Sequence, residues 1–89
     1  LIYYMHKVSR TSLLAHPPLL KNIEVGVFAS RSPFRPNHIA ISIVRLKGIE
    51  NNILFTSNID ALDMTPLLDI KPYFKSLDIK FDANNGYLV

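Results

Sequence analysis

Short runs in which apolar and polar residues alternate make up most of the regular pattern in this chain. The clearest is HIAISIVRLK, residues 38–47, where isoleucine stands at every second position from Ile39 to Ile43. A period of two residues is that of a β-strand with one face toward the core. The pattern therefore predicts a strand over 38–47 whose isoleucine face is buried.

Further segments have strand-like patterns of similar length: LIYYM (1–5), NIEVGVFAS (22–30), NILFTS (52–57), LLDI (67–70) and IKFDANNGYLV (79–89), the last as strand, Asn-Gly turn and strand stub. Residues 48–52 separate two strands by a length and composition suited to a hairpin. IDALD, residues 59–63, is either one helical turn or an extended loop. The pattern predicts an all-β or mainly β domain of short strands with short helical turns, built as a barrel or a sandwich.

The length of 89 residues, with 48% hydrophobic and 19% charged residues, fits a single globular domain over residues 1–89. A domain this small buries only about 60% of its unfolded surface, so a partner subunit would add to its core. The first residues, LIYYM, read as a buried strand without a polar lead-in. We therefore expect the beginning of the domain to be missing from this chain.

The sequence also excludes several locations and chemistries. No apolar run reaches the roughly 20 residues of a membrane-spanning helix, and LIYYMHK lacks the basic start and cleavage site of a signal peptide. We expect a soluble, cytoplasmic protein with no membrane partner. The absence of cysteine excludes disulfides, thiolate metal sites and a cysteine nucleophile. His6, His16 and His38 are far apart and lack metal-ligand spacing, so no metal is expected.

Charge is divided unequally between the two halves of the chain. Residues 1–47 carry seven lysines and arginines against Glu24 alone, a net charge of +6, whereas residues 48–89 carry three lysines against six acidic residues, a net charge of −3. A basic half of this kind suits a phosphate-bearing partner such as a nucleic acid. Two complementary surfaces of a self-associating subunit would give the same division.

The segment RSPFRPN, residues 31–37, places two arginines among two prolines immediately before the predicted strand. Pro33 and Pro36 fix their own φ angles and push the residues before them toward extended geometry. The segment is therefore expected to be a stiff, exposed loop that holds Arg31 and Arg35 in place. Read generically, it is a loop that forms an ion pair with something nearby, since the chain contains no general nucleotide-binding or nucleophile motif.

The full strings are more specific than their composition. GVFASRSPFRPNHIAISIVRLKGIE at 26–50, followed by LDMTPLLDIKPY at 62–73, resembles the TsaA-like family of tRNA threonylcarbamoyladenosine N6-methyltransferases. The family hallmark runs Gly-Val-Phe-Ala-Thr-Arg-Ser-Pro-x-Arg-Pro-Asn-Pro-Ile-Gly, then Leu-Asp-x-x-Asp-Gly-Thr-Pro, then Asp-Ile-Lys-Pro-Tyr. Three ordered motifs at matching spacing are improbable by chance. The resemblance covers residues 1–73 and continues weakly to the end.

The resemblance implies a small β-barrel methyltransferase that works as a homodimer and uses S-adenosylmethionine without a Rossmann sheet. It implies methylation of N6 of threonylcarbamoyladenosine in the anticodon loop of a tRNA. The cofactor contacts that it implies in this sequence are His6, Lys7, Arg31, Ile41, Asp60, Ala61, Leu62 and Asp63.

These residue types suit such a cofactor. Asp60 and Asp63 supply carboxylates for the sulfonium cation and the ribose hydroxyls. Arg31 suits the carboxylate of the amino-acid tail, and Ile41 suits an apolar wall for adenine. Because methyl transfer depends mainly on in-line positioning of the acceptor nitrogen, strong acid-base residues are not required and no catalytic residue is assigned.

Three cations are candidate contacts with the phosphates or the anticodon loop of RNA: Arg35, Arg45 and Lys71. The alternative is that Arg35 or Lys71 only pairs with Asp69 or Asp63.

Three positions depart from the family pattern. His38 stands where the family has proline, Ala40 where it has glycine, and Met64 where it has the glycine of Asp-Gly-Thr-Pro. Glycine is commonly kept where φ is positive or where another group approaches closely, so Ala40 and Met64 are expected to reshape or narrow the cofactor pocket. The family's N-terminal strand and its Pro-Arg-Gln loop have no counterpart in these residues.

The sequence leaves more than one functional hypothesis open. The first is an S-adenosylmethionine-dependent tRNA methyltransferase, or a piece of one. The second is a degenerate TsaA-like module that binds cofactor, RNA or a partner without catalytic turnover. A purely structural dimer subunit is disfavoured, because arginines held by prolines suit an inert surface poorly.

Overall fold

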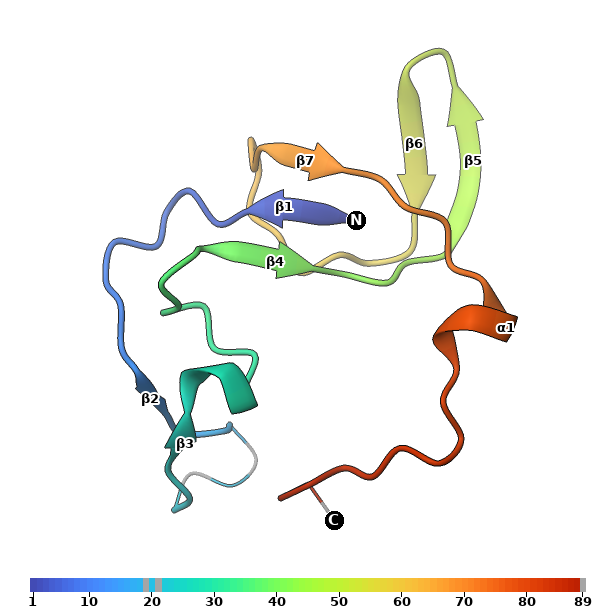
Figure 1. Cartoon of the computed structure of the whole chain (residues 1–89). Coiled ribbons are helices and arrows are strands. Elements are labelled where there is room, and N and C mark those ends of the chain that lie inside the picture. Colours follow the sequence, from blue (N-terminus) through green and yellow to red (C-terminus); the bar gives the residue numbers. More distant parts are fainter. Residues whose placement is uncertain (19, 21, 89) are drawn as a thin grey trace.

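The computed structural model describes residues 1–18, 20 and 22–88, and most of its regular structure consists of short strands (Figure 1). In chain order the elements are β1 (Ile2–Tyr4), β2 (Leu14–Ala15), β3 (Val25–Gly26), the 3-10 helix η1 (Val27–Ala29), β4 (Ile39–Ile41), β5 (Leu46–Glu50), β6 (Ile53–Thr56), β7 (Leu67–Asp69) and the short helix α1 (Lys75–Asp78). The predicted mainly β class is confirmed.

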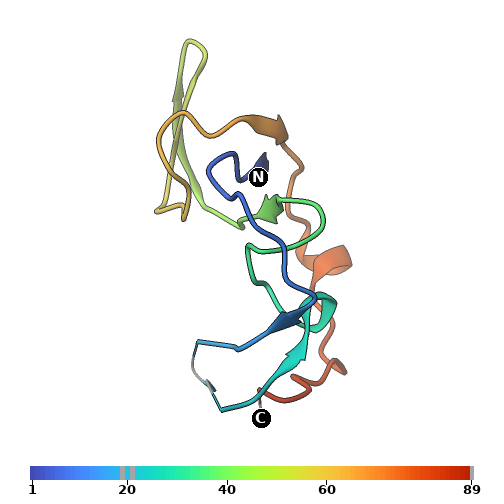
Figure 2. The ribbon, with the colours of Figure 1, turned by 90° about the vertical axis from the view of Figure 1, so that its left-hand side faces the viewer.

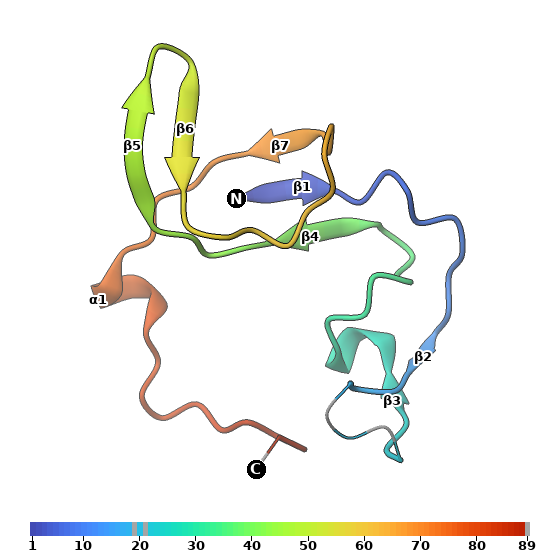
Figure 3. The same cartoon turned by 180° about the vertical axis from the view of Figure 1, so that it is seen from behind.

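β1 is the central strand of a sheet with the order β4-β1-β7. Both neighbours run antiparallel to β1, with Ile2 opposite Ile41 and Tyr4 opposite Ile39, and the register with β7 shifts between Ile2 and Tyr3. β2 pairs with β3, and β5 with β6, as separate two-stranded sheets. Within the described residues these sheets do not close into the predicted barrel, because no ladder joins one sheet to another (Figure 3).

The predicted hairpin is confirmed in β5 and β6. Glu50 pairs with Ile53 across a two-residue turn in which Asn51 has a φ of +53°. Asparagine tolerates this left-handed region better than most residues, so the chain turns there without a glycine. The hairpin extends beyond the three-stranded sheet at one corner of the molecule (Figures 1 and 3).

The strand predicted over 38–47 is divided, and the prediction of a buried isoleucine face is wrong. β4 ends at Ile41 and β5 begins only at Leu46. The side chains of Ile39, Ile41 and Ile43 are 47%, 60% and 72% exposed. Alternating apolar residues give a strand one apolar face, but that face is buried only where another layer of the structure packs on it. In the described part of the chain no layer buries this face.

The described chain has a very small core. Its buried residues are Tyr3, Ala15, Pro17 and Val27. The accessible surface is 7719 Å², compared with about 5,300 Å² expected for a compact monomer of this mass. The radius of gyration of 15.3 Å likewise exceeds the about 12 Å expected for a compact domain of this length. The molecule is thin, with extents of 46 × 36 × 19 Å, as Figure 2 shows.

Two predicted strands are shorter or absent. The NIEVGVFAS segment is a strand only at Val25–Gly26, because the chain turns into η1 directly afterward. Residues 79–88 form turns rather than the predicted strand and stub, and Val89 lies outside the described residues. Gly86, with a φ of +57°, donates its N–H to Asn84 Oδ1. A strand needs a ladder partner, and the described part of the chain offers none to this segment.

The hydroxyl of Tyr3 joins three segments that are far apart in sequence. It donates a hydrogen bond of 2.9 Å to the Asp60 carbonyl, which leaves the Ser42 hydroxyl, at 2.8 Å, as the donor to the Tyr3 oxygen. Tyr3 is only 5% exposed, and a buried hydroxyl needs such partners. β1, the end of β4 and the IDALD segment are therefore held together by one side chain.

Tyr3→Phe should destabilise the fold, because it removes both hydrogen bonds and leaves the ring in place. We expect a loss of about 1–2 kcal/mol in the free energy of unfolding, measured by denaturation in urea. Tyr4→Phe is the matched control, since Tyr4 is 41% exposed and its hydroxyl has no hydrogen bond within the described residues. Equal stability of the Tyr3→Phe variant and the wild type would contradict this role.

Candidate functional site

The arginine loop, residues 30–37, follows η1 and is shaped by serine side chains. The Ser30 hydroxyl donates to the Val27 carbonyl at 2.8 Å and accepts the Ser32 N–H at 3.2 Å. The Ser32 hydroxyl then accepts the Phe34 N–H at 3.2 Å. Serine favours such local turns because its short side chain reaches the backbone two residues away. The loop thus makes local hydrogen bonds of its own, and residues 32–35 are half-buried where an exposed loop was expected.

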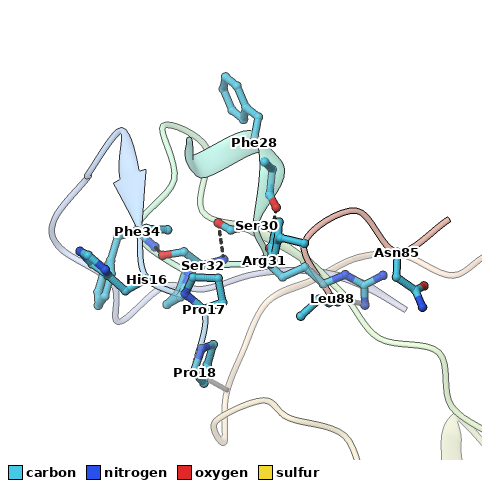
Figure 4. Close-up of a pocket in the computed structure, with 14 residues that line it drawn as sticks. His16, Pro17, Pro18, Phe28, Ser30, Arg31, Ser32, Phe34, Asn85 and Leu88 are labelled. Carbon is cyan, nitrogen blue, oxygen red and sulfur yellow. Dashed lines mark hydrogen bonds between the residues drawn. The ribbon is translucent and has the colours of Figure 1, made fainter. Parts of the chain in front are cut away.

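The arginine loop borders a pocket of about 790 Å³, here called the arginine pocket (Figure 4). Pro17 and Pro18, from the β2–β3 connection, form one apolar wall, and Leu88 forms another. The C-terminal segment is attached to the loop region through the Tyr87 hydroxyl, which donates to the Ala29 carbonyl at 2.7 Å. Arg31 brings a cationic, exposed side chain to a lining that also includes the polar residues His16, Ser30, Ser32 and Asn85.

A second, smaller pocket of about 280 Å³, here called the aspartate pocket, lies beside the buried Tyr3 ring. Residues 61–65 and Leu67 contribute to its lining. Its turn is closed by the Thr65 hydroxyl and N–H, which both donate to the Leu62 carbonyl. Met64 in this turn has a φ of +65°, a region that costs a residue with a side chain about 1 kcal/mol. The glycine of the family motif thus corresponds to a position with left-handed backbone.

The structure places the expected cofactor contacts in two groups. Arg31 lines the arginine pocket, whereas Ala61, Leu62 and Asp63 line the aspartate pocket. The two pockets share no described lining residue. The sequence order of the motifs therefore identified residues at two pockets but did not predict that the pockets are separate in one copy of the chain.

The remaining expected contacts line neither of these pockets. His6 and Lys7 form the turn that follows β1, and Ile41 lies at the end of β4. Asp60 takes part in the structure through its backbone carbonyl, which accepts the Tyr3 hydroxyl. Of these residues, Ile41 is therefore in the three-stranded sheet and His6 is in the turn beyond it.

The candidate RNA contacts differ in how they are engaged. Arg35 is half-buried, and its Nη1 donates to the carbonyls of Val27 and Ser30, so its partners are backbone groups rather than a carboxylate. Lys71 Nζ lies 2.9 Å from Asp69 Oδ2 in an exposed ion pair, the partner named in the alternative interpretation. The side chain of Arg45 is exposed.

Two long-range contacts at the arginine loop carried no recognisable sequence signal. The Arg10 guanidinium carbon lies 4.0 Å from the centre of the Phe34 ring, a cation–π geometry. The Tyr87 hydroxyl reaches Ala29 from the far end of the chain. Neither pair has a spacing that local pattern analysis can detect, because each depends on the path of the chain between its members.

No described helix has the length and apolar character needed to cross a membrane. Among residues 1–18, 20 and 22–88, no three histidine, cysteine, aspartate or glutamate side chains are grouped so that they could hold a metal ion.

Comparison with known proteins matches residues 1–79 to the family model described as the tRNA-methyltransferase O N-terminal domain. A probable S-adenosyl-L-methionine-binding protein of Pyrococcus abyssi is 46% identical over 88 residues, which are 99% of this chain and 47% of that protein. A tRNA (adenine(37)-N6)-methyltransferase of Eikenella corrodens is 45% identical over 78 residues, 83% of this chain and 44% of that protein. The human protein with the same description is 39% identical over 80 residues, 88% of this chain and 18% of its own length. The chain thus spans less than half the length of these curated relatives.

Lys71→Ala should raise the pKa of Asp69. The Lys71 ammonium, through its hydrogen bond, and then the Ile70 N–H hold the pKa of this carboxyl below its ordinary value. A carboxyl with a lowered folded-state pKa contributes stability above its unfolded pKa of about 4 and loses it as the pH falls through the folded pKa. Titration of the Asp69 carboxyl by NMR, with Lys75→Ala as the control, measures the effect. An unchanged pKa in Lys71→Ala would mean that the ion pair does not form in solution.

Proposed function

The chain belongs to the family of the tRNA-methyltransferase O N-terminal domain, and on that premise we propose that it is the cofactor-binding part of an S-adenosylmethionine-dependent tRNA methyltransferase. The proposed acceptor is N6 of threonylcarbamoyladenosine in the anticodon loop. We place the reaction in the cytoplasm. The observation that carries the proposal is the arginine pocket, which combines apolar walls with one exposed guanidinium.

The arginine pocket has the properties that this cofactor requires. Its volume of about 790 Å³ lies in the range of small-molecule sites. Its proline and leucine walls suit the apolar faces of an adenosyl group, and the Arg31 guanidinium suits the carboxylate of the amino-acid tail. The hydroxyls of Ser30 and Ser32 are already used within the loop, so Arg31 is the main cationic group offered to a ligand there.

The chain's own residues would act by binding and orienting rather than by acid-base chemistry. The cofactor supplies a methyl group activated by its sulfonium charge. The acceptor nitrogen would take up this methyl group and release a proton to water, so the part of the chain's own residues would be to hold the two in line. In-line placement is the main requirement for this step. Arg31 would hold the carboxylate of the cofactor's amino-acid tail. The Asp63 side chain would accept a hydrogen bond from a ribose hydroxyl or lie near the sulfonium cation.

The basic half of the chain supports tRNA as the partner. Residues 1–47 have a net charge of +6, and a phosphate backbone is bound mainly through such cations. In the proposal Arg45 and Lys71 contact the RNA, and Lys71 would exchange its exposed ion pair with Asp69 for a phosphate. An exposed pair of this type contributes little stability and is therefore replaced at little cost.

A homodimer is part of the proposal, because the exposed apolar surface needs a cover. The accessible surface of 7719 Å² exceeds the about 5,300 Å² of a compact monomer by more than the about 800 Å² that one partner buries in a standard interface. Exposed apolar side chains are found on β4 and on the β5–β6 hairpin, among them Ile41, Ile49 and Phe55. A second copy is also a means by which the two separate pockets would be completed.

Met64 favours a second candidate function, a binding module without turnover. A φ of +65° is strained for a residue with a side chain, and Met64 is 83% exposed beside the aspartate pocket. A longer side chain at this position would narrow the approach to Asp63. The pocket at Arg31 would still bind a ligand in that case, with weaker affinity, and methyl transfer would be lost because the ligand is not held in line.

Arg31→Ala should weaken the binding of S-adenosylmethionine to the intact protein by about 10- to 100-fold, because one charge-assisted interaction contributes about 1.5–3 kcal/mol. Asp63→Ala should weaken binding as well. Lys47→Ala removes the same unit of charge from an exposed position outside both pockets and should bind like the wild type. Isothermal titration calorimetry measures all four proteins.

No detectable binding by the folded wild type would refute both the enzyme and the cofactor-binding module. If the wild type binds the cofactor but leaves tRNA unmethylated, the result would favour the binding module without turnover.

The protein should sediment as a dimer, and Ile43→Glu should shift it toward the monomer. Ile43 is 72% exposed on the uncovered isoleucine face, where a buried carboxylate would be costly in a dimer interface. Lys47→Glu serves as the control for added negative charge, because Lys47 is polar and exposed already. A wild type that remains monomeric at working concentration would contradict the dimer.

A further inference from the structure

Arg35 is bonded to the end of η1 through a half-buried side chain. Its Nη1 donates to the Ser30 carbonyl at 2.6 Å and to the Val27 carbonyl at 3.1 Å. The Ser30 carbonyl lies just beyond η1, where carbonyls have no partner within the helix and need a donor from elsewhere. Hydrogen bonds from a charged donor are roughly twice as strong as those between neutral groups. Arg35 thus supplies one donor group to two carbonyls, one at the first residue of η1 and one at the residue that follows its last.

The Val27 carbonyl is the point at which the loop contacts converge. Besides Arg35 Nη1, it accepts the Ser30 N–H at 3.1 Å and the Ser30 hydroxyl at 2.8 Å. Val27 is only 3% exposed, so this carbonyl belongs to a buried residue. Arg35 also lies over the ring of Phe28, with 5.7 Å from its guanidinium carbon to the ring centre. These contacts attach the guanidinium to both the backbone and a side chain of η1.

The bond to Ser30 has a direct consequence for Arg31. The Ser30 carbonyl belongs to the peptide unit that joins Ser30 to Arg31, and a peptide unit is planar. Fixing that carbonyl therefore fixes the orientation of the Arg31 N–H and limits the direction in which the Arg31 side chain leaves the backbone. Arg31 lines the arginine pocket from this position (Figure 4).

We propose that Arg35 is a positioning residue of the arginine pocket: it holds the Ser30–Arg31 peptide unit so that Arg31 presents its guanidinium to a carboxylate-bearing ligand. The proposal rests on the proposed function in that the ligand is S-adenosylmethionine. A positioning role differs from a phosphate contact. In a phosphate contact the charge of Arg35 matters more than the planar arrangement of its guanidinium N–H groups. Lysine keeps that charge but lacks the fork, so the two roles predict different behaviour of Arg35→Lys.

The test compares Arg35→Ala, Arg35→Lys and Lys47→Ala in the intact protein. Arg35→Ala should weaken S-adenosylmethionine binding by about tenfold, which is the size of one charge-assisted hydrogen bond. Arg35→Lys should recover only part of that loss. Lys47→Ala should bind S-adenosylmethionine with the affinity of the wild type. Amide hydrogen exchange over residues 28–34 should accelerate in Arg35→Ala while the melting temperature of the whole protein stays close to that of the wild type.

Salt-dependent binding of tRNA separates the two roles. Arg45→Ala should reduce the slope of log affinity against log salt by about one, as expected for the loss of one phosphate contact. A phosphate role for Arg35 predicts the same reduction in Arg35→Ala, full recovery in Arg35→Lys, and unchanged cofactor affinity and exchange. That combination would overturn the positioning role.

Failure of the proposed function gives a different result from failure of this inference. If the wild type binds no S-adenosylmethionine, the proposed cofactor is wrong, and hydrogen exchange alone decides the role of Arg35. Unchanged exchange over residues 28–34 in Arg35→Ala would then refute it. If Arg35→Ala unfolds, Arg35→Lys takes its place: faster exchange confined to residues 28–34 supports the inference, and exchange equal to that of the wild type overturns it.

Discussion

The hydroxyl of Tyr3 is the interaction on which the arrangement of the described chain depends most. Among the described residues only Tyr3, Ala15, Pro17 and Val27 are buried, so the hydrophobic contribution within one copy is small. A buried hydroxyl that satisfies Ser42 and Asp60 then has a correspondingly large role. It fixes the segment that forms the aspartate pocket against the central strand of the main sheet. The position of that pocket thus follows from one polar contact rather than from a packed layer.

The arginine pocket is organised by a different principle. Its loop is ordered by local serine turns, by two prolines and by a guanidinium that binds backbone carbonyls. Such a loop keeps its shape without much apolar burial, which suits a site on a thin molecule. The two pockets are therefore independent units within one copy of the chain. In the proposed dimer, a second copy packed on the exposed apolar side chains of β4 and the β5–β6 hairpin would couple them.

Local features of the fold could be predicted from the sequence, and non-local ones could not. The strands β1 and β7 and the β5–β6 hairpin follow from period-two patterns and turn residues within a few positions of one another. Burial of the isoleucines of β4 depends on a covering layer, and a strand over 79–88 depends on a ladder partner, so both predictions failed. The motifs located Arg31 and Asp63 at pockets but gave no information about the distance between those pockets. The role proposed for Arg35 could not be predicted, because its partners are backbone carbonyls, which every residue has.

The central claim is that S-adenosylmethionine binds at the arginine pocket. Photo-crosslinking tests it most directly: the intact protein is irradiated with S-adenosylmethionine that carries a labelled methyl group, digested, and mapped by mass spectrometry, with excess unlabelled cofactor as the competitor. Binding at the arginine pocket places the competed label in residues 28–34 or in the adjoining wall at Pro17 and Pro18. A label confined to residues 59–67 of the aspartate pocket, or one that excess cofactor does not reduce, would contradict it.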